Sequence, residues 1–148
     1  MSKDIQNTIR DIFNTQKLAV LATLDKDQPY ENLVAFAATK DLQYLMFATA
    51  QYTRKYDNIK ANFKVSLLID TRSNFEKDFH KGMAVTALGE AEEVSGPERQ
   101  PLLDSYLEKH PYLERFVNAP TCHFFRVRVT KYILVREFQH VVEFTLNE

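Results

Sequence analysis

The sequence predicts a mainly β fold, a small barrel of about six strands with flanking helices. Short apolar runs recur along the chain with turn residues between them, which is typical of strands joined as an up-and-down meander. The run Val65–Ile69 is apolar on both faces, which indicates a strand in the middle of a closed or covered sheet. Residues 1–148 contain no internal repeat, low-complexity tract or linker, so we expect a single domain.

The first part of the chain predicts one helix and three strands. Asp4–Thr15 repeats isoleucine and phenylalanine at spacings of three and four residues, which is typical of a helix packed across a sheet. Three apolar runs follow, each bounded by turn residues, and we assign them to strands at Leu18–Leu24, Tyr30–Thr39 and Gln43–Ala50.

A polar turn and an amphipathic helix separate the third strand from Val65–Ile69. Thr53 fits the N-cap position of this helix. Tyr56, Ile59 and Phe63 lie three and four residues apart, so we expect them to form the buried face of the helix.

The next segment, residues 71–82, is polar and is predicted to be a loop anchored by Phe75 and Phe79. Met83–Val94 resumes the strand pattern, and Gly89 within it indicates a bend or a close approach of two backbones.

The last third predicts a helix, a short helical turn and the longest strand. The helix begins after Ser95-Gly96-Pro97, and a further turn ends near Asn118. Apolar and polar residues alternate in the longest strand. The assigned ranges are Glu98–His110 for the helix, Cys122–Phe138 for the strand, and His140–Leu146 for an additional strand or tail.

Charge balance and cysteine content exclude several classes of function. The formal net charge is −1, from 19 basic and 20 acidic residues, so no overall field favours nucleic acid or a membrane surface. The lone Cys122 forms no intramolecular disulfide, and the histidines lack zinc-site spacing, so no metal is expected. The sequence shows no signal peptide and no apolar run of about 20 residues. We therefore expect a soluble, cytoplasmic protein.

The charges at the start of the predicted helix at Thr53 have an unusual sign. A helix N-terminus carries partial positive charge and usually has acidic residues, yet Arg54 and Lys55 follow Thr53. The helix N–H groups, a hydroxyl, a guanidinium and an ammonium together suit a phosphate monoester. The alternative is that both side chains are ordinary solvated residues. With only three glycines, the chain has no phosphate-binding loop of the P-loop or dinucleotide type.

Several of these motifs occur together in one known family. The sequence resembles the pyridoxamine 5′-phosphate oxidase-related, FMN-binding split-barrel family in FAT at 47–49, TRK at 53–55, NI at 58–59 and VSLL at 65–68. The similarity extends from about Ile9 to Phe138. It implies a six-stranded split β-barrel, usually a homodimer that holds two FMN molecules at the subunit interface.

The same resemblance implies which residues bind the cofactor. Thr53, Arg54 and Lys55 would hold the FMN phosphate, with Thr49 hydrogen-bonding nearby. The flavin ring would lie along the second strand, against the backbone of Asn32, Leu33, Val34 and Ala35.

One further residue is a candidate from its position alone. Asn74 follows the central strand in the segment TRSN, so we expect it to emerge at the barrel rim and to border the cofactor or substrate. The alternative is that Asn74 only forms a turn.

The sequence departs from the vitamin B6 oxidases of this family. Those enzymes carry a longer C-terminal segment with an Arg-x-His motif and a Trp, and this chain has neither. Small apolar residues around Ala84 stand where those oxidases place a Gln. True oxidation of pyridoxamine phosphate is therefore not expected.

The resemblance implies an FMN-binding flavoprotein that acts as an FMN-dependent oxidoreductase on an unidentified small molecule, with NADH or NADPH as the donor to test. No nucleophile–base pair is evident, so no catalytic residue is assigned. A non-enzymatic flavin carrier or redox sensor would have the same sequence features. A third alternative is haem binding or degradation, for which His123 and His140 are weak candidate ligands. The sequence also leaves a deazaflavin open in place of FMN.

Overall fold

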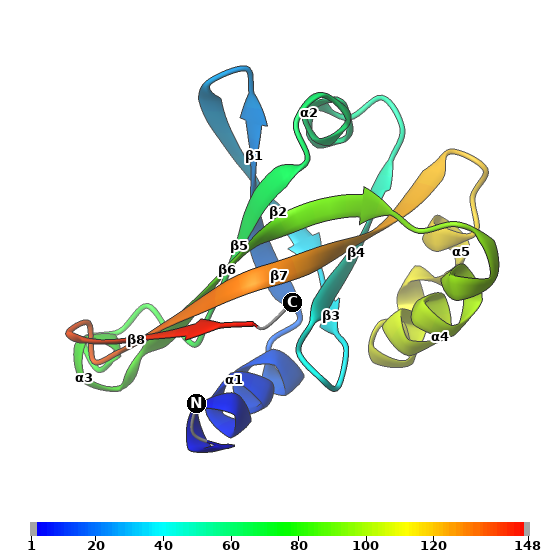
Figure 1. Ribbon diagram of the computed structural model, residues 1–148. Helices are drawn as coiled ribbons and strands as arrows, with labels where there is room; N and C mark the ends of the chain where they lie inside the picture. The colour runs from blue at the N-terminus through cyan, green and yellow to red at the C-terminus, as the bar shows by residue number, and fades with distance from the viewer. Residues whose placement is uncertain (1–2, 147–148) are drawn as a thin grey trace.

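The computed structural model describes residues 3–146 and shows a strongly curled antiparallel sheet with flanking helices (Figure 1). The strands in this part of the chain are β1 (Leu18–Asp25), β2 (Gln28–Ala35), β3 (Ala37–Ala38), β4 (Tyr44–Ala50), β5 (Lys64–Asp70), β6 (Met83–Glu93), β7 (Cys122–Arg136) and β8 (His140–Thr145). The helices are α1 (Lys3–Thr15), α2 (Arg54–Ala61), α3 (Asp78–Lys81), α4 (Arg99–Lys109) and α5 (Glu114–Val117), with 3₁₀ turns η1 (Gly96–Glu98) and η2 (Pro111–Leu113).

The strands are hydrogen-bonded in the order β2-β1-β5-β6-β7-β4-β3, and every pairing is antiparallel. β7 is the longest strand because it pairs with β6 along one edge and with two strands in turn along the other. Its residues 122–128 pair with β4, and its residues 131–136 pair with β8. The C-terminal segment is therefore a strand and not a loose tail.

The two edges of the curled sheet meet at one corner of the chain. β2 and β3 lie at opposite ends of the strand order, yet only Phe36 separates them in sequence. The carbonyl of Ala35 accepts a hydrogen bond from the Tyr106 hydroxyl (3.0 Å), and Nε2 of His110 lies 2.7 Å from the Phe36 carbonyl. Side chains of α4 and its C-cap thus replace a neighbouring strand at this corner, and the predicted strand 30–39 divides here.

The predicted mainly β fold with flanking helices is confirmed, with two differences in the strands. The sheet has eight strands in the described residues instead of six, because one predicted strand divides and the C-terminal segment adds β8. β5 lies between β1 and β6, as expected for a central strand. Its outer face is only partly covered, however, since Ser66 and Leu68 are half-buried while the inward residues are buried.

Gly89 marks the sharpest irregularity in the sheet. The register of β6 against β7 shifts between Leu88 and Gly89. A Cβ atom at Gly89 would collide with the backbone oxygen of Arg128 and would lie 2.8 Å from Cγ1 of Val127. The close backbone approach predicted from the sequence is therefore confirmed, and it lets β6 bend around the core.

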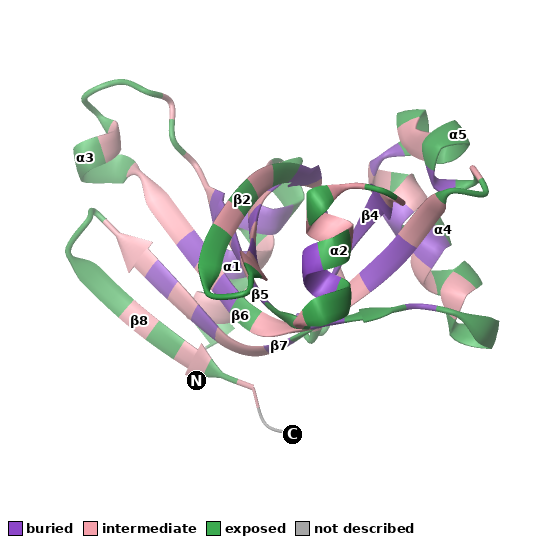
Figure 2. Ribbon diagram, turned by 90° about the horizontal axis from the view of Figure 1, so that it is seen from above, coloured by how far each residue is buried: buried purple, intermediate pink, exposed green. Residues whose placement is uncertain are grey.

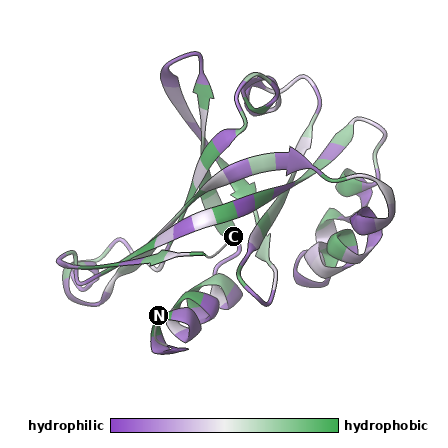
Figure 3. Cartoon of the chain, viewed as in Figure 1, coloured by the Kyte–Doolittle hydropathy of each residue, from purple (hydrophilic) through white to green (hydrophobic). Residues whose placement is uncertain are grey.

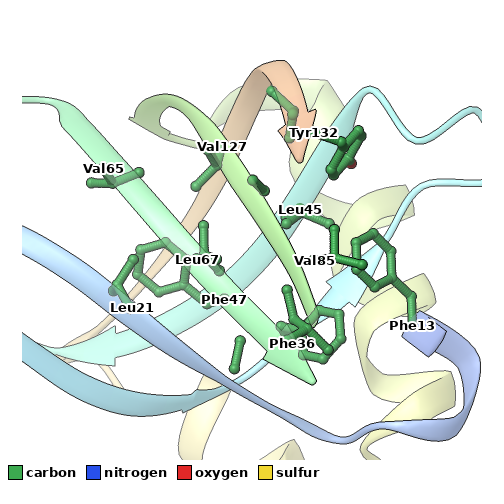
Figure 4. Packing of buried hydrophobic residues seen from close by; sticks show 14 of the residues in the cluster. Phe13, Leu21, Phe36, Leu45, Phe47, Val65, Leu67, Val85, Val127 and Tyr132 are labelled. Carbon is green, nitrogen blue, oxygen red and sulfur yellow. The ribbon is translucent and has the colours of Figure 1, made fainter. Parts of the chain in front are cut away.

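The main core fills the inside of the curl (Figures 2 and 4). Alternate residues of the strands point inward, as the buried residues Leu21, Leu67 and Val127 show. α1 covers one end of this core and shows hydrophobic and hydrophilic residues on different sides (Figure 3). Its Phe13 packs edge-to-face on Phe36, with ring centroids 5.5 Å apart.

A second buried cluster lies between α4, α5 and the outer face of β3, β4 and β7. Tyr106 of α4 packs edge-on against Phe124 of β7 at 5.5 Å. β4 is therefore covered on both faces, which explains why Leu45–Thr49 are all buried. Within residues 3–146, no helix has the length and apolar composition needed to cross a bilayer.

Candidate functional site

The predicted phosphate site lies at the start of α2, which covers the end of the curled sheet opposite α1 (Figure 1). Thr53 is the N-cap, as predicted: its backbone is extended and its hydroxyl accepts a hydrogen bond from the N–H of Tyr56 at 3.3 Å. The same hydroxyl donates to the carbonyl of Ala50 at 2.9 Å and lies 3.0 Å from Oγ1 of the fully buried Thr49. These bonds fix the last residues of β4 relative to the first turn of α2.

Arg54 and Lys55 form the first turn of α2, and neither side chain pairs with a carboxylate of the described residues. Arg54 is exposed and Lys55 is half-buried. Partial burial lowers the pKa of the Lys55 ammonium, because desolvation disfavours its charged form. An anion bound between the two side chains would oppose this effect, so the charges of the first turn favour an anion over a cation at this place.

The Arg54 guanidinium contacts an aromatic side chain of β2, the strand at one end of the strand order. Its Cζ atom lies 5.2 Å from the ring centroid of Tyr30 in β2, within the range of a cation–π contact. Tyr30 is paired with Thr23 of β1, whose hydroxyl accepts a hydrogen bond from the buried Asn58 amide at 2.9 Å. α2 is therefore tied to the β1–β2 hairpin through Arg54 and Asn58, which lie four residues apart on the same side of the helix.

Because Asn58 is buried against β1, the buried face of α2 differs from the predicted one. Ile59 is buried and Tyr56 is half-buried, but Phe63 lies beyond the last helical residue and is exposed. The helix ends at Ala61 because Asn62 has an extended backbone (φ −148°, ψ 112°), and the Asn62 side chain accepts a hydrogen bond from the N–H of Lys64. Asn58, not Phe63, is the additional buried residue of α2.

β2 brings the predicted ring-binding residues to the edge of the sheet, so one row of its backbone groups has no strand partner within residues 3–146. Strand alternation splits the side chains: Val34 is buried, whereas Leu33 points outward and is 63% exposed. Oδ1 of Asn32 is buried and has no hydrogen-bond partner among the described residues. A buried acceptor without a donor is costly, so it suits a bound group that supplies an N–H or O–H.

Asn74 lies away from this group. It sits in the loop before α3, at the other end of the molecule from α2 (Figures 1 and 2). It is exposed, has a positive φ of 66°, and donates its backbone N–H to Asp78 at 2.8 Å. Within one chain, the structure thus brings Tyr30 and Arg54 together and leaves Asn74 apart.

His123 of β7 lies beneath the first turn of α2. Its ring packs against Tyr56 with centroids 4.5 Å apart, and its Nδ1 lies 2.6 Å from a carboxylate oxygen of Glu93. Nε2 is buried and lacks a hydrogen-bond partner among the described residues. His140, the other candidate ligand, is exposed at the start of β8.

The sequence analysis did not identify two residues that lie beside the site, Tyr30 and Tyr52. Tyr30 has no local pattern that indicates Arg54 as its partner, because the contact joins residues far apart in the chain. Tyr52 is exposed and has a positive φ of 70° immediately before the N-cap. Bulky residues rarely adopt a positive φ, and no sequence motif indicates that Tyr52 does so.

The sequence profile of the pyridoxamine 5′-phosphate oxidase family matches residues 5–136. No curated protein matches the chain. Among solved structures, a protein from Clostridium acetobutylicum, related to general stress protein 26 and described as of the pyridoxinephosphate oxidase family, is similar with a TM-score of 0.76. It is 14% identical, with 99% of this chain and 97% of that chain covered.

The names of two other similar structures refer to two different cofactors. A haem-binding protein from Mycobacterium smegmatis has a TM-score of 0.82 and 18% identity over 92% of this chain, which spans 55% of that longer chain. A FAD-binding protein from Mesorhizobium loti has a TM-score of 0.68 and 16% identity, over 90% of this chain and 94% of that chain. At these identities the likeness shows the fold, the split barrel. The profile match over most of the chain shows the family: this protein belongs to the pyridoxamine 5′-phosphate oxidase family.

Proposed function

We propose that the protein is an FMN-binding flavoprotein and acts as an FMN-dependent oxidoreductase on a small molecule. The observation that carries this proposal is the first turn of α2, where two cations flank a capped helix N-terminus without a carboxylate partner among the described residues. A phosphate dianion is the complement of this arrangement. Thr53, Arg54 and Lys55 would hold it, with Thr49 fixing the cap.

The residues along β2 fit the rest of the cofactor. The unpaired edge of β2 offers backbone donors and acceptors to a planar ring, and the buried Asn32 Oδ1 offers a further acceptor. The flavin would supply the redox chemistry, and this chain would supply binding, orientation and exclusion of water.

A homodimer is part of the proposal. The outer face of β1, β2 and β5 carries Leu18, Val20, Leu33 and Leu68 around a depression of about 450 Å³. Contiguous exposed apolar residues are typical of interaction surfaces. A second copy on this face would cover them and would enclose a cofactor that a single subunit can hold only on its surface.

A flavin carrier or redox sensor remains the alternative within the same cofactor class. Turnover distinguishes it from an enzyme: an oxidoreductase oxidises NADH or NADPH with an added acceptor, and a carrier leaves the nucleotide unchanged. Haem binding is a second candidate, favoured by the unpartnered Nε2 of His123 and by the name of the M. smegmatis protein. The absorption spectrum separates flavin, deazaflavin and haem.

The test of the phosphate site compares FMN with riboflavin, which lacks the phosphate. Each charge-assisted contact to a phosphate is worth roughly 1.5–3 kcal/mol. Arg54→Ala and Lys55→Ala should therefore each weaken FMN binding about 10- to 100-fold and leave riboflavin binding nearly unchanged. The apo-protein should become slightly more stable, since a positive charge near the helix N-terminus is removed.

Lys26→Ala is the matched control, because Lys26 is an exposed cation in the β1–β2 turn. It should change neither affinity. Equal FMN affinity in wild type and both site variants, or an equal loss for FMN and riboflavin, would reject the phosphate site.

A further inference from the structure

α2 is held from two opposite sides. Arg54 and Asn58 face the β1–β2 hairpin. Tyr56 and Lys60 each follow two residues later, and at about 100° per residue they lie on the opposite side of the helix. Figure 1 shows α2 between the β1–β2 hairpin and β4. The side of α2 that carries Tyr56 and Lys60 therefore has its own set of partners.

Four side chains on this side form a closed cycle of contacts. The His123 ring packs on the Tyr56 ring with centroids 4.5 Å apart, and Nδ1 of His123 lies 2.6 Å from Oε2 of Glu93. The other oxygen of the same carboxylate lies 3.7 Å from Nζ of Lys60, and this ammonium lies 5.8 Å from the Tyr56 ring centroid. Glu93 ends β6 and His123 is near the start of β7, so the cycle joins α2 to both strands.

The cycle is connected to the N-cap of α2. Tyr56 is the residue whose N–H bonds to the Thr53 hydroxyl, at 3.3 Å. His123 is the register partner of Thr49, so their side chains lie on one face of the sheet. Oγ1 of Thr49 in turn lies 3.0 Å from Oγ1 of Thr53. A displacement of the His123 ring would therefore move the capped residue and disturb the threonine beneath the cap.

Packing alone does not explain a histidine at position 123. Its Nε2 is buried and has no hydrogen-bond partner among the described residues, which costs stability. A phenylalanine would pack on Tyr56 without this cost. The imidazole adds the bond from Nδ1 to Glu93, in which Nδ1 carries the proton because a carboxylate only accepts. This bond fixes the orientation of the ring on which Tyr56 packs.

We propose that His123 and Glu93 are positioning residues of the phosphate site and hold the first turn of α2 through Tyr56 and Lys60. Neither side chain would touch the phosphate, because a carboxylate repels an anion and both contact the side of α2 instead of its N-terminal end. Their effect is to fix the directions of the N–H groups and of Arg54, which a dianion must engage together. The inference rests on the proposed FMN function and concerns only the phosphate end of the cofactor.

The test compares FMN with riboflavin in three variants of the full chain. His123→Phe keeps a ring against Tyr56 and removes the bond to Glu93, and Glu93→Ala removes both contacts of the carboxylate. Each should weaken FMN binding about 3- to 10-fold through partial loss of the phosphate contacts, and leave riboflavin binding unchanged. Glu93→Gln retains an acceptor for Nδ1 and loses only the exposed pair with Lys60, so FMN affinity should stay within about 2-fold of wild type.

Glu90→Ala is the matched control, because Glu90 pairs with Arg128 across the same two strands at the middle of β7. It should change neither affinity. A second measurement needs no flavin: hydrogen exchange of the Tyr56 backbone N–H in the apo-protein. Exchange should be faster in His123→Phe and Glu93→Ala than in wild type, and unchanged in Glu90→Ala, because only the first two loosen the turn.

The outcomes separate this inference from the FMN proposal. Unchanged exchange at Tyr56 in both variants would overturn the positioning role alone. A loss of FMN affinity in Arg54→Ala, but in neither His123→Phe nor Glu93→Ala, would also overturn it and retain the phosphate site. Equal losses for FMN and riboflavin would overturn it in favour of general destabilisation. A haem absorption band that disappears in His123→Phe would overturn both proposals in favour of a haem ligand.

Discussion

At the scale of single residues, Arg54 and Lys55 in the first turn of α2 differ from the arginines at the centre of β7. Arg126 pairs with Glu92 and Glu98, and Arg128 pairs with Glu90, so carboxylates of β6 and η1 neutralise both guanidinium groups. Arg54 has an aromatic ring as its neighbour instead. A ring orients a guanidinium without neutralising it, which leaves the charge available to an anion.

Tyr30 is therefore expected to position Arg54 for the phosphate. Tyr30→Leu should weaken FMN binding about 2- to 5-fold, because an exposed cation–π contact contributes roughly 0.5–1 kcal/mol. Riboflavin affinity should not change, and Tyr30→Phe should retain wild-type behaviour. Titration of both flavins measures the effect.

Tyr44→Leu provides a matched control, since the Tyr44 ring lies 4.7 Å from Cζ of Arg126 in the same kind of contact away from α2. An equal loss of FMN affinity in the Tyr44 and Tyr30 variants would show that the effect is general destabilisation.

At the scale of elements, the corner between β2 and β3 depends on α4 and its C-cap. His110 is fully buried and hydrogen-bonds to the Phe36 carbonyl through Nε2 and to the Tyr112 hydroxyl through Nδ1 (3.1 Å). Burial, with a smaller contribution from Lys109 and Lys17, lowers the pKa of His110, against the opposing effect of the Phe36 carbonyl. The folded protein therefore favours the neutral form of the His110 imidazole.

This pKa shift predicts a loss of stability in acid. The unfolded chain takes up the His110 proton near pH 6.5 and the folded chain only below it, so stability is full above pH 6.5 and falls as the pH drops through that value. We expect His110→Gln to remove part of the decrease in melting temperature between pH 7.5 and 5.5, on the order of a few °C. An identical pH profile for wild type and variant would contradict the assignment.

The bend of β6 gives a second test of an element. Gly89→Ala should destabilise the protein by roughly 1–3 kcal/mol, because the added Cβ meets the backbone of β7 and the two strands must separate. Gly96→Ala is the comparison: its φ is +72° but the space around it is open, so only a conformational cost of about 1 kcal/mol applies. Denaturant unfolding of both variants measures the difference, and a Gly89 variant no less stable than the Gly96 variant would refute the close approach.

At the scale of the whole molecule, the helices leave the outer face of the β1–β2–β5 region with apolar residues exposed. The proposed dimer places this face at the interface. Leu33→Lys should weaken self-association more than 10-fold and reduce FMN affinity in parallel, because a buried unpaired ammonium is costly and the cofactor would lose one wall of its site. Size-exclusion chromatography with light scattering gives the mass.

Phe116→Lys places the same charge at an exposed aromatic residue of α5, on another part of the molecule. It should leave both the mass and FMN affinity unchanged. A monomeric wild type at micromolar concentration would reject the dimer.

The sequence by itself predicted most of the helices and strands, although it missed the break between β2 and β3 and the short helix α3 in the segment predicted to be a loop. Alternation predicted the buried residues of β7, the cap at Thr53 predicted the start of α2, and Gly89 predicted the approach of two backbones. These features depend on neighbours within a few residues, whose spacing fixes which side chains share a face.

Only the tertiary structure decided which distant residues meet. No periodicity in the sequence encodes which distant segments lie side by side. Examples are the contact of Tyr30 with Arg54, the bonds from α4 and its C-cap to the end of β2, and the contact of Phe79 with Phe138. Phe75 and Phe79 illustrate the reason: the sequence predicts both as anchors of the loop, but their side chains are 70% and 63% exposed. An aromatic residue in a loop is expected to be buried, but whether the fold offers a core to bury it depends on long-range packing.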